Sequence, residues 1–304
     1  MERELILDYD SGRIAARLDR GERLLIERVR LQLHAAERLA LIGETGSGKT
    51  MTALSILRLL PDNVSMRDGK LWFDGRDLMA ERSIRSLLGV ELVYISQNGL
   101  EFLDPARSVR QHLYDSLKKL SVPRRERESR AVDALSAAGF PEPREILGKY
   151  PFQLSGGMAQ RVTIALTACS RAKLLIADEP TNGLDAEARE AFFQLLDRVF
   201  PTAAKLIITH DMAVAALCSR VQVLCGGQTV ESGPSIQVLR TPRHPYTRAL
   251  LAALVENGMQ ESPPLRAKAG QCPFYRRCRA ASDACLGELP LRRDGDTEWW
   301  CCQP

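Results

Sequence analysis

The sequence contains no apolar run long enough to cross a bilayer, which takes roughly 20 residues, and its longest runs, at 174–177 and 206–208, are far shorter. Residues 1–4 lack the apolar core of a signal peptide. The net charge is only +4, from 42 basic and 38 acidic residues, so charge gives no argument for nucleic-acid binding. No internal repeat is evident. We therefore expect a cytosolic chain that does not itself cross a membrane, with 304 residues for one large α/β domain and an appendage.

Cysteine is sparse over most of the chain and crowded near residue 300. Three cysteines stand in apolar surroundings, where we expect small buried side chains: Cys169, Cys218 and Cys225. The other five fall within residues 272–302, and they are Cys272, Cys278, Cys285, Cys301 and Cys302. A disulfide framework is not expected in a reducing cytosol, so this clustering favours a metal site.

The order of apolar patterns predicts an α/β domain. The first part predicts antiparallel strands within 22–33, a buried strand at 38–42, a helix at 50–60 and strands at 71–73 and 90–96. Residues 108–148 have a helical, charge-rich pattern, in which 124–130 is expected to be a solvated face. A strand at 174–177, a helix at 186–199 and a strand at 205–209 then restore the alternation typical of a parallel sheet. A hairpin at 221–231 and a tail rich in Pro, Arg and Cys follow.

A phosphate-binding loop is predicted where the strand at 38–42 ends. The pattern G-x-x-x-x-G-K-[ST] is matched by Gly43, Glu44, Thr45, Gly46, Ser47, Gly48, Lys49 and Thr50. Glycines let backbone N–H groups converge on phosphate oxygens, and the following helix adds its positive N-terminal end. We expect Lys49 to reach the β and γ phosphates and Thr50 to supply a hydroxyl to Mg²⁺.

Polar side chains follow three further predicted strands. Asp178 ends an apolar strand and is a natural partner for Mg²⁺, directly or through water, while Glu179 can polarise an attacking water. His210 follows the strand at 205–209, where it can contact the γ phosphate. Gln97 follows the strand at 90–96 and would mean nothing on its own.

One short segment indicates which family of nucleotide-binding proteins these motifs resemble. Leu154-Ser155-Gly156-Gly157-Met158 lies between the phosphate loop and the acidic strand, and with the other motifs it resembles the ATP-binding cassette (ABC) family over residues 3–304. The resemblance implies Walker A at 43–50, the Q-loop at Gln97, the signature at 154–158, Walker B at 174–178, catalytic Glu179, the D-loop at 182–185 with Asp185, and the switch histidine His210. It also implies ATP, with Mg²⁺ at Thr50, Gln97 and Asp178.

The family resemblance implies an ABC-type nucleotide-binding domain of the P-loop NTPase class. This domain, residues 1–235, would contain an antiparallel β subdomain and a helical subdomain at about 98–165, followed by a cysteine-containing extension at 236–304. Members form head-to-tail dimers in which ATP lies between one subunit's Walker A and the other's signature. Ser155 and the N–H groups of Gly156 and Gly157 at a helix start would make that second anion cradle.

Two departures from the family pattern concern the nucleotide site. The family usually stacks an aromatic side chain on adenine from a position before Walker A, but residues 18–22 contain no aromatic residue and Tyr9 lies too far upstream. Arg20 is a substitute through a cation–π contact. The second departure is Gly183 in the D-loop, which is expected to loosen coupling between the two sites.

The tail resembles that of the oligopeptide, dipeptide and nickel importers. The segments at 241–251 and 270–278, then Cys285 and Cys301-Cys302, match that subfamily's extension, which is associated with a [4Fe–4S] cluster. Four thiolates suit a cubane, and the spacing is unlike the paired C-x-x-C of zinc ribbons. Zinc and free thiols stay open as alternatives. The predicted ligands are Cys272, Cys278, Cys285 and, in preference to Cys301, Cys302.

The leading hypothesis for function is the ATPase of an importer at the cytoplasmic face of the membrane. The resemblance implies two permease subunits, a second ATPase subunit in a hetero- or homodimer, and an extracytoplasmic binding protein. Residues 97–107 would take the permease's coupling helices. Peptides are favoured as cargo, with nickel or a metal chelate as the alternative. A soluble ABC ATPase acting on nucleic acid or ribosomes is disfavoured, because only 105 residues separate Lys49 from Ser155 and there is one cassette. Glu179 and His210 disfavour a module that binds ATP without turnover.

Overall fold

The structure is a computed structural model that describes residues 4–19, 21–96, 99–182, 184–253 and 270–303. The chain divides into two compact units, each described by itself below. The first unit comprises residues 1–81 and 206–304, and the second comprises residues 82–205. Among the described residues, no helix combines the length and the apolar character that a membrane span requires.

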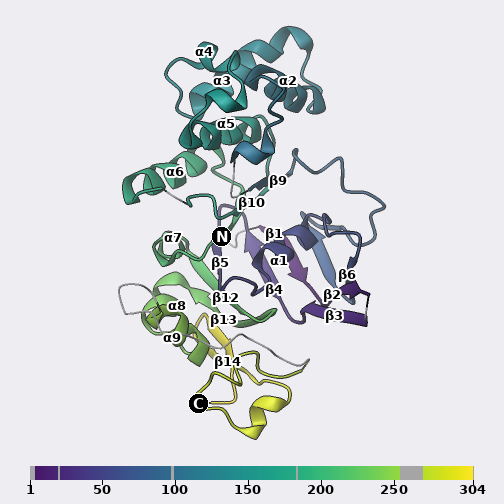
Figure 1. Ribbon diagram of the computed structural model, residues 1–304, viewed down its shortest axis with the longest axis vertical. Helices are drawn as coiled ribbons and strands as arrows, with labels where there is room; N and C mark the ends of the chain where they lie inside the picture. Colours follow the sequence, from purple (N-terminus) through teal and green to yellow (C-terminus); the bar gives the residue numbers. More distant parts are fainter. Residues whose placement is uncertain (1–3, 20, 97–98, 183, 254–269, 304) are drawn as a thin grey trace. The chain divides into compact units, whose positions relative to one another are not determined.

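The first unit contains most of the β-structure (Figure 1). Its N-terminal part consists of β1 (Leu5–Asp10), β2 (Arg13–Leu18), β3 (Gly21–Ile26), β4 (Arg30–His34), β5 (Arg38–Ile42), α1 (Lys49–Ile56), β6 (Val64–Arg67), β7 (Lys70–Phe73) and β8 (Arg76–Asp77). Its later part consists of α7 (Met212–Ala216), β12 (Arg220–Cys225), β13 (Gln228–Pro234), α8 (Ser235–Arg240), α9 (Pro245–Ala252), η5 (Asp283–Leu286), β14 (Leu291–Asp294) and β15 (Thr297–Trp300). The division between the units falls inside β11 (Ala204–Ile208).

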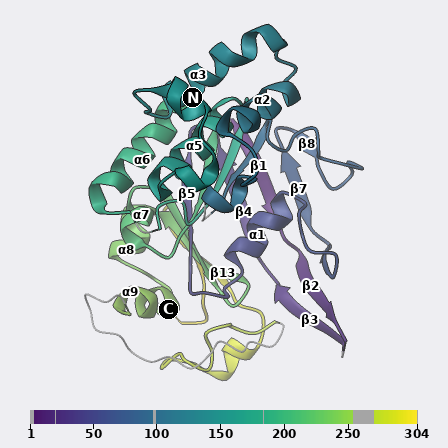
Figure 2. The same cartoon turned by 45° about the horizontal axis from the view of Figure 1, so that its top comes forward.

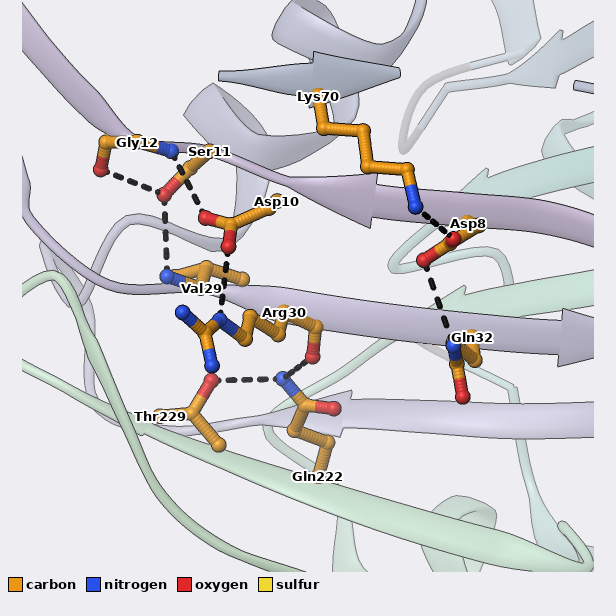
Figure 3. Close-up of polar contacts among 10 residues, drawn as sticks. All are labelled: Asp8, Asp10, Ser11, Gly12, Val29, Arg30, Gln32, Lys70, Gln222 and Thr229. Carbon is orange, nitrogen blue, oxygen red and sulfur yellow. Dashed lines mark hydrogen bonds and ion pairs between the residues drawn. The ribbon is translucent and has the colours of Figure 1, made fainter. Parts of the chain in front are cut away.

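The first unit contains two small antiparallel sheets in addition to its main sheet. One has the order β4-β1-β7-β8 and the other the order β3-β2-β6. Alternation explains β4, in which Leu31 and Leu33 are buried while Gln32 is exposed, because successive side chains of a strand point to opposite faces. The exposed face carries ion pairs of Lys70 with Asp8 and of Arg30 with Asp10 (Figure 3).

The main sheet of this unit runs β14-β15-β13-β12-β5-β11. Strands β5 and β12 are parallel, while β13 and β15 add antiparallel strands at the other side. Gln222 of β12 links this sheet to the small sheet that contains β4. Its side-chain amide donates to the carbonyl of Arg30 in β4 at 2.9 Å and to Thr229 Oγ1 in β13 at 2.7 Å (Figure 3). The last two strands of the C-terminal extension, β14 and β15, extend this sheet beyond β13, and this end of the chain is drawn in yellow in Figure 1.

A buried carboxylate ties the start of the extension to β13. Glu231 is fully buried, and its two oxygens accept the backbone N–H groups of Arg243 and His244 at 2.8 and 2.9 Å. His244 then caps α9 by accepting the N–H of Tyr246 at 3.0 Å. Burial lowers the pKa of His244 to about 3, so its ring is neutral and the capping nitrogen is free of a proton.

The second unit is mainly helical (Figure 2). It contains β9 (Leu92–Ile95), η1 (Gly99–Phe102), α2 (Val109–Lys119), η2 (Arg124–Glu126), α3 (Arg127–Ala137), α4 (Pro143–Leu147), η3 (Pro151–Gln153), α5 (Gly156–Ala168), β10 (Leu174–Asp178) and α6 (Ala186–Val199). Helix α3 contacts both α2 and α5. Strands β9 and β10 are parallel neighbours, and β10 is buried along its whole length.

The elements predicted from sequence are present, with shifted ends. The helix predicted to reach residue 60 ends at Ile56, because Arg58 takes a left-handed backbone with φ of 50° that no helix continues through. The strand predicted at 90–96 is shortened to Leu92–Ile95, and that predicted at 205–209 lies at Ala204–Ile208. The predicted helix at 186–199 is confirmed in full. The domain boundary predicted near residue 235 stays a prediction.

Replacing Tyr9 by phenylalanine tests the contact between β1 and α1. The Tyr9 hydroxyl lies 2.6 Å from Ser55 Oγ, in the buried core. Tyr9→Phe removes this bond and is expected to lower the free energy of unfolding by about 1 kcal/mol, as typical for one buried hydrogen bond. Urea titration followed by circular dichroism measures the change. The control is Tyr275→Phe, whose hydroxyl has no hydrogen bond to any described residue; an equal loss in both variants would contradict the assignment.

Candidate nucleotide-binding site

The predicted phosphate loop connects β5 to α1. Strand β5 is buried and delivers Gly43 with a φ of 152°. A side chain there would have its Cβ 2.2 Å from the carbonyl oxygen of Leu224, so only glycine fits. Gly46 and Gly48 also have positive φ, of 80° and 104°. The sequence GETGSGKT therefore forms an irregular turn that ordinary residues cannot adopt, followed directly by a helix N-terminus.

Lys49 is the cation of this loop. Its side chain is largely buried, and its ammonium group donates to the carbonyls of Gly43 at 2.8 Å and Glu44 at 3.1 Å. These contacts hold the charge over the loop rather than in solvent. Thr50 begins the exposed face of α1. The buried Ser47 hydroxyl has no hydrogen-bond partner among the described residues, so it is a donor available to an anion in the loop.

In the second unit, β10 ends at the predicted magnesium-binding carboxylate, Asp178, and the predicted catalytic carboxylate, Glu179, follows it directly. Asp178 is the buried last residue of this strand, and Tyr94 of β9 donates its hydroxyl to Asp178 Oδ2 at 3.3 Å. Burial and then the Asp178 charge raise the pKa of Tyr94, so the phenol stays protonated and able to donate. Glu179 has a φ of 48°, a conformation rare for a residue with a side chain and typical of functional sites.

The predicted signature forms an open helix N-terminus. Ser155 caps α5, with its hydroxyl accepting the N–H of Met158 at 3.3 Å. Ser155, Gly156 and Gly157 are exposed, and an added Cβ on either glycine would meet no atom within 4 Å. These glycines are therefore not required by packing within the chain, and they leave backbone N–H groups accessible to an external anion.

For the remaining predicted site residues, the structure gives fewer contacts. Asp185 caps α6 by accepting the N–H of Ala188 at 2.8 Å, and His210 is exposed after β11. Gln97, predicted as the Q-loop residue, and Arg20, predicted to contact adenine, lie outside the described residues. Tyr9 is buried against Ser55, which agrees with its exclusion as the adenine-stacking residue.

The cysteines of the extension lie close together. Cys272 N–H donates to the carbonyl of Cys285 at 2.9 Å. Burial, and with it the neighbouring thiols of Cys285, Cys301 and Cys278, raise the pKa of Cys272 to about 12. Cys301 interacts in the same way with Cys285 and Cys278, whereas Cys302 interacts with Cys285 and Cys301. Among the described residues, no group of three or more His, Cys, Asp or Glu has the arrangement that holds a single metal ion.

Comparison with known proteins decides the family. The family model described as ABC transporter matches residues 26–182, and the one described as the oligopeptide/dipeptide transporter C-terminal region matches residues 230–285. The chain belongs to the ABC transporter family, within its oligopeptide/dipeptide importer branch. As an ABC ATPase it hydrolyses ATP to drive transport.

The ABC ATPase has relatives that match it over most of their length. It is 36% identical over 298 residues to the probable D,D-dipeptide transport ATP-binding protein DdpD of Escherichia coli (strain K12), covering 92% of this chain and 90% of that one. It is 35% identical over 280 residues to the dipeptide transport ATP-binding protein DppD of the same strain, covering 87% and 86%.

A solved structure supports the fold of the ABC ATPase. The post-hydrolysis dimer of the ATP-binding cassette MJ0796 with ADP and Pi matches with a TM-score of 0.66 at 22% identity. The match covers 76% of this chain and 99% of that one. The fold predicted from sequence, an ABC-type P-loop domain with antiparallel β and helical subdomains, is thereby confirmed.

The sequence did not predict a role for three side chains that contact these motifs. Tyr94 contacts Asp178, while Tyr246 and Arg277 contact the phosphate-loop residue Glu44. Tyr94 lies in β9, which pairs with β10, so the parallel sheet predicted from sequence could have indicated that Tyr94 lies near Asp178. Tyr246 and Arg277 lie 202 and 233 residues from Glu44, and no periodicity in the sequence connects them.

Replacing Tyr94 by phenylalanine tests the support of Asp178. The variant loses one hydrogen bond to a carboxylate, which is worth about 1.5 kcal/mol or more, so the concentration of Mg²⁺ giving half-maximal ATPase activity should rise roughly tenfold. Steady-state ATPase assays over a Mg²⁺ titration measure it. Tyr114→Phe, on α2, is the control. An unchanged Mg²⁺ dependence in Tyr94→Phe would show that the bond does not serve the metal-binding carboxylate.

Proposed function

We propose that this chain powers the uptake of dipeptides or oligopeptides through separate permease subunits. The observation that carries the proposal is the match of residues 230–285 to the oligopeptide/dipeptide transporter C-terminal region, joined in one chain to the ATPase motifs. Relatives aligned over about nine-tenths of the chain are named for dipeptide and D,D-dipeptide transport. The nickel alternative gains no support from these relatives.

We infer the following roles in the ATPase cycle. Walker A residues 43–50 hold the phosphates, with Lys49 on the β and γ phosphates and Thr50, Gln97 and Asp178 serving Mg²⁺. Glu179 polarises the attacking water, and His210 contacts the γ phosphate. Each of these is a positioning or electrostatic role, because phosphoryl transfer needs in-line geometry and charge stabilisation more than covalent chemistry.

The exposed signature supports a dimeric working form. Ser155, Gly156 and Gly157 present N–H groups outward without a contact that packing requires, so they suit ATP bound to a second ATPase subunit. MJ0796, which shares the fold, is described as a dimeric cassette. Asp185 would lie near the same interface. The two ATPase subunits, two copies of this chain or this chain and a related ATPase, bind two permease subunits at the cytoplasmic face of the membrane. An extracytoplasmic binding protein delivers the substrate to the permease from the other side.

Replacing Glu179 by glutamine tests the catalytic role. Removal of the charge should cut ATP hydrolysis by about a hundredfold or more while ATP still binds, so the dimer should accumulate. Light scattering after size exclusion, with and without MgATP, measures this for the chain alone and mixed with its second ATPase subunit. Lys49→Ala is the matched comparison, expected to lose both binding and dimer. Full turnover by either variant would refute the assigned roles.

Cargo is tested on the complete importer. Reconstituted in proteoliposomes, it should hydrolyse ATP several-fold faster when its binding protein carries a dipeptide than when that protein is empty. A panel of dipeptides, longer peptides and nickel chelates separates the cargo classes. Stimulation by a nickel chelate but by no peptide would overturn the peptide assignment.

We also propose that the extension holds a [4Fe–4S] cluster. Support comes from the electrostatic coupling of the thiols, in which each of the five interacts with at least two others, and four thiolates suffice for a cubane. The four thiolates of a cubane bind four different irons, so they need not converge on one point as ligands of a zinc ion must. Cys272, Cys278 and Cys285 are three ligands. The fourth is Cys302 or Cys301, and Cys301 is the one in range of all three others.

Metal analysis of anaerobically purified protein tests the cluster. About four irons and four acid-labile sulfides per chain are expected. Cys301→Ser and Cys302→Ser form a matched pair, in which only the ligand variant should lose iron. Zinc in stoichiometric amount, or absence of both iron and sulfide, would contradict the proposal.

A further inference from the structure

The phosphate loop contacts the C-terminal extension directly. We define the cysteine segment as residues 270–303. This segment and helix α9 contact Glu44 of the loop, and the cysteine segment also contacts Gly226 of the hairpin between β12 and β13. All of these contacts lie within the first unit. None of them involves a side chain that family motifs assign to ATP binding apart from Glu44, so they raise a separate question about what the extension does there.

The strongest contact is a two-pronged ion pair between Arg277 and Glu44. Arg277 Nη1 lies 2.9 Å from Glu44 Oε2, and Arg277 Nη2 lies 2.7 Å from Glu44 Oε1. The Arg277 side chain is only 7% exposed and that of Glu44 34%. Paired, partly desolvated hydrogen bonds of this geometry are among the strongest that a protein makes. Arg277 therefore fixes both the charge and the direction of the Glu44 side chain.

An aromatic stack holds Arg277 in place. Its guanidinium lies 5.4 Å from the centre of the Phe274 ring, and that ring makes an edge contact at 5.5 Å with Tyr246 of α9. The Tyr246 hydroxyl accepts the backbone N–H of Glu44 at 3.0 Å, and Tyr246 is fully buried. Glu44 is thus held at two points: Arg277 binds its side chain, and Tyr246 binds its backbone N–H.

A third contact runs through the hairpin between β12 and β13. Pro273 lies against Gly226, where an added Cβ would come within 2.9 Å of the proline ring. The next residue, Gly227, donates its N–H to the Ser47 carbonyl at 3.0 Å. The cysteine segment, the hairpin and the phosphate loop are therefore consecutive layers of one packed structure.

Glu44 presents an electrostatic problem that Arg277 solves. A carboxylate at the second position of a loop that binds a highly anionic triphosphate repels the ligand, and charges a few ångströms apart in a partly desolvated site interact strongly. We propose that Arg277 is a positioning residue of the nucleotide site, which neutralises Glu44 and holds the loop open for phosphate, with Tyr246 fixing the loop backbone. This inference rests on the proposed function, since it needs a loop that binds ATP.

Two explanations of the Arg277 contact, neutralisation of Glu44 and packing of the extension, give different expected results. If Arg277 acts by neutralising Glu44, loss of the arginine should weaken nucleotide binding, and removal of the Glu44 carboxylate that is left unpaired should restore it. If Arg277 only packs the extension, the second change would not help. The defect should also shrink at high salt, because screening weakens the repulsion.

The experiment compares five full-length proteins: wild type, Arg277→Met, Arg277→Met with Glu44→Gln, Arg277→Lys, and the control Arg276→Met, whose arginine is the exposed neighbour. Titration calorimetry gives the Kd for Mg-ATPγS, and ATPase assays give KM and kcat. Arg277→Met should raise Kd and KM about tenfold and leave kcat within about twofold. The double variant should return to within about threefold of wild type, and Arg276→Met should match wild type. Arg277→Lys, which keeps the charge without the fork, should fall between.

Two results would overturn the inference: an Arg277→Met Kd equal to that of Arg276→Met, or a double variant as weak as the single one. Thermal unfolding of each protein accompanies the titrations, and Arg277→Lys carries the test if Arg277→Met fails to fold. Failure of the proposed function has a different signature, because wild type and Arg276→Met would then also show no binding of Mg-ATPγS.

Discussion

The close approach of the phosphate loop to the turn between β12 and β13 is the constraint on which the first unit depends. The Cβ of any residue at 43 would lie 2.2 Å from the Leu224 carbonyl, and that of any residue at 227 would lie 2.4 Å from the Leu25 carbonyl. Two glycines thus allow three segments of backbone to meet with no side chain between them. The parallel pairing of β5 with β12 fixes this distance, and the extension packs on the outer side of the same hairpin.

Glycine has the opposite use in the signature. An added Cβ on Gly156 or Gly157 would meet no atom within 4 Å, so packing within the described chain does not demand their small size. A residue type that costs helix stability without aiding packing is explained by a ligand that approaches the backbone from outside. Under the proposed function, the phosphate loop is shaped by packing within the chain, whereas the signature is shaped for a phosphate held by another subunit.

Local sequence predicted most of the helices and strands, for physical reasons that also mark its limits. The strand, loop and helix around residues 38–56 follow from periodicity and glycine spacing, both of which act over a few residues. The early end of α1 did not follow, because Arg58 adopts a left-handed backbone that its residue type does not favour. Tyr246 and Arg277 were missed because their role depends on contacts across more than 200 residues. Such pairings belong to tertiary structure, which one sequence does not display.

The packing of Arg277 and Tyr246 on the phosphate loop has a consequence for synthesis. The loop at 43–50 emerges early from the ribosome, but the side chains that grip Glu44 are made some 200 residues later. Strand β15, which extends the sheet beside β13, is made later still. Contacts so distant in sequence form late in folding. The nascent loop therefore completes its surroundings only after Tyr246 and Arg277 have been made, so a product terminated before them carries an ATP-binding motif without its native support.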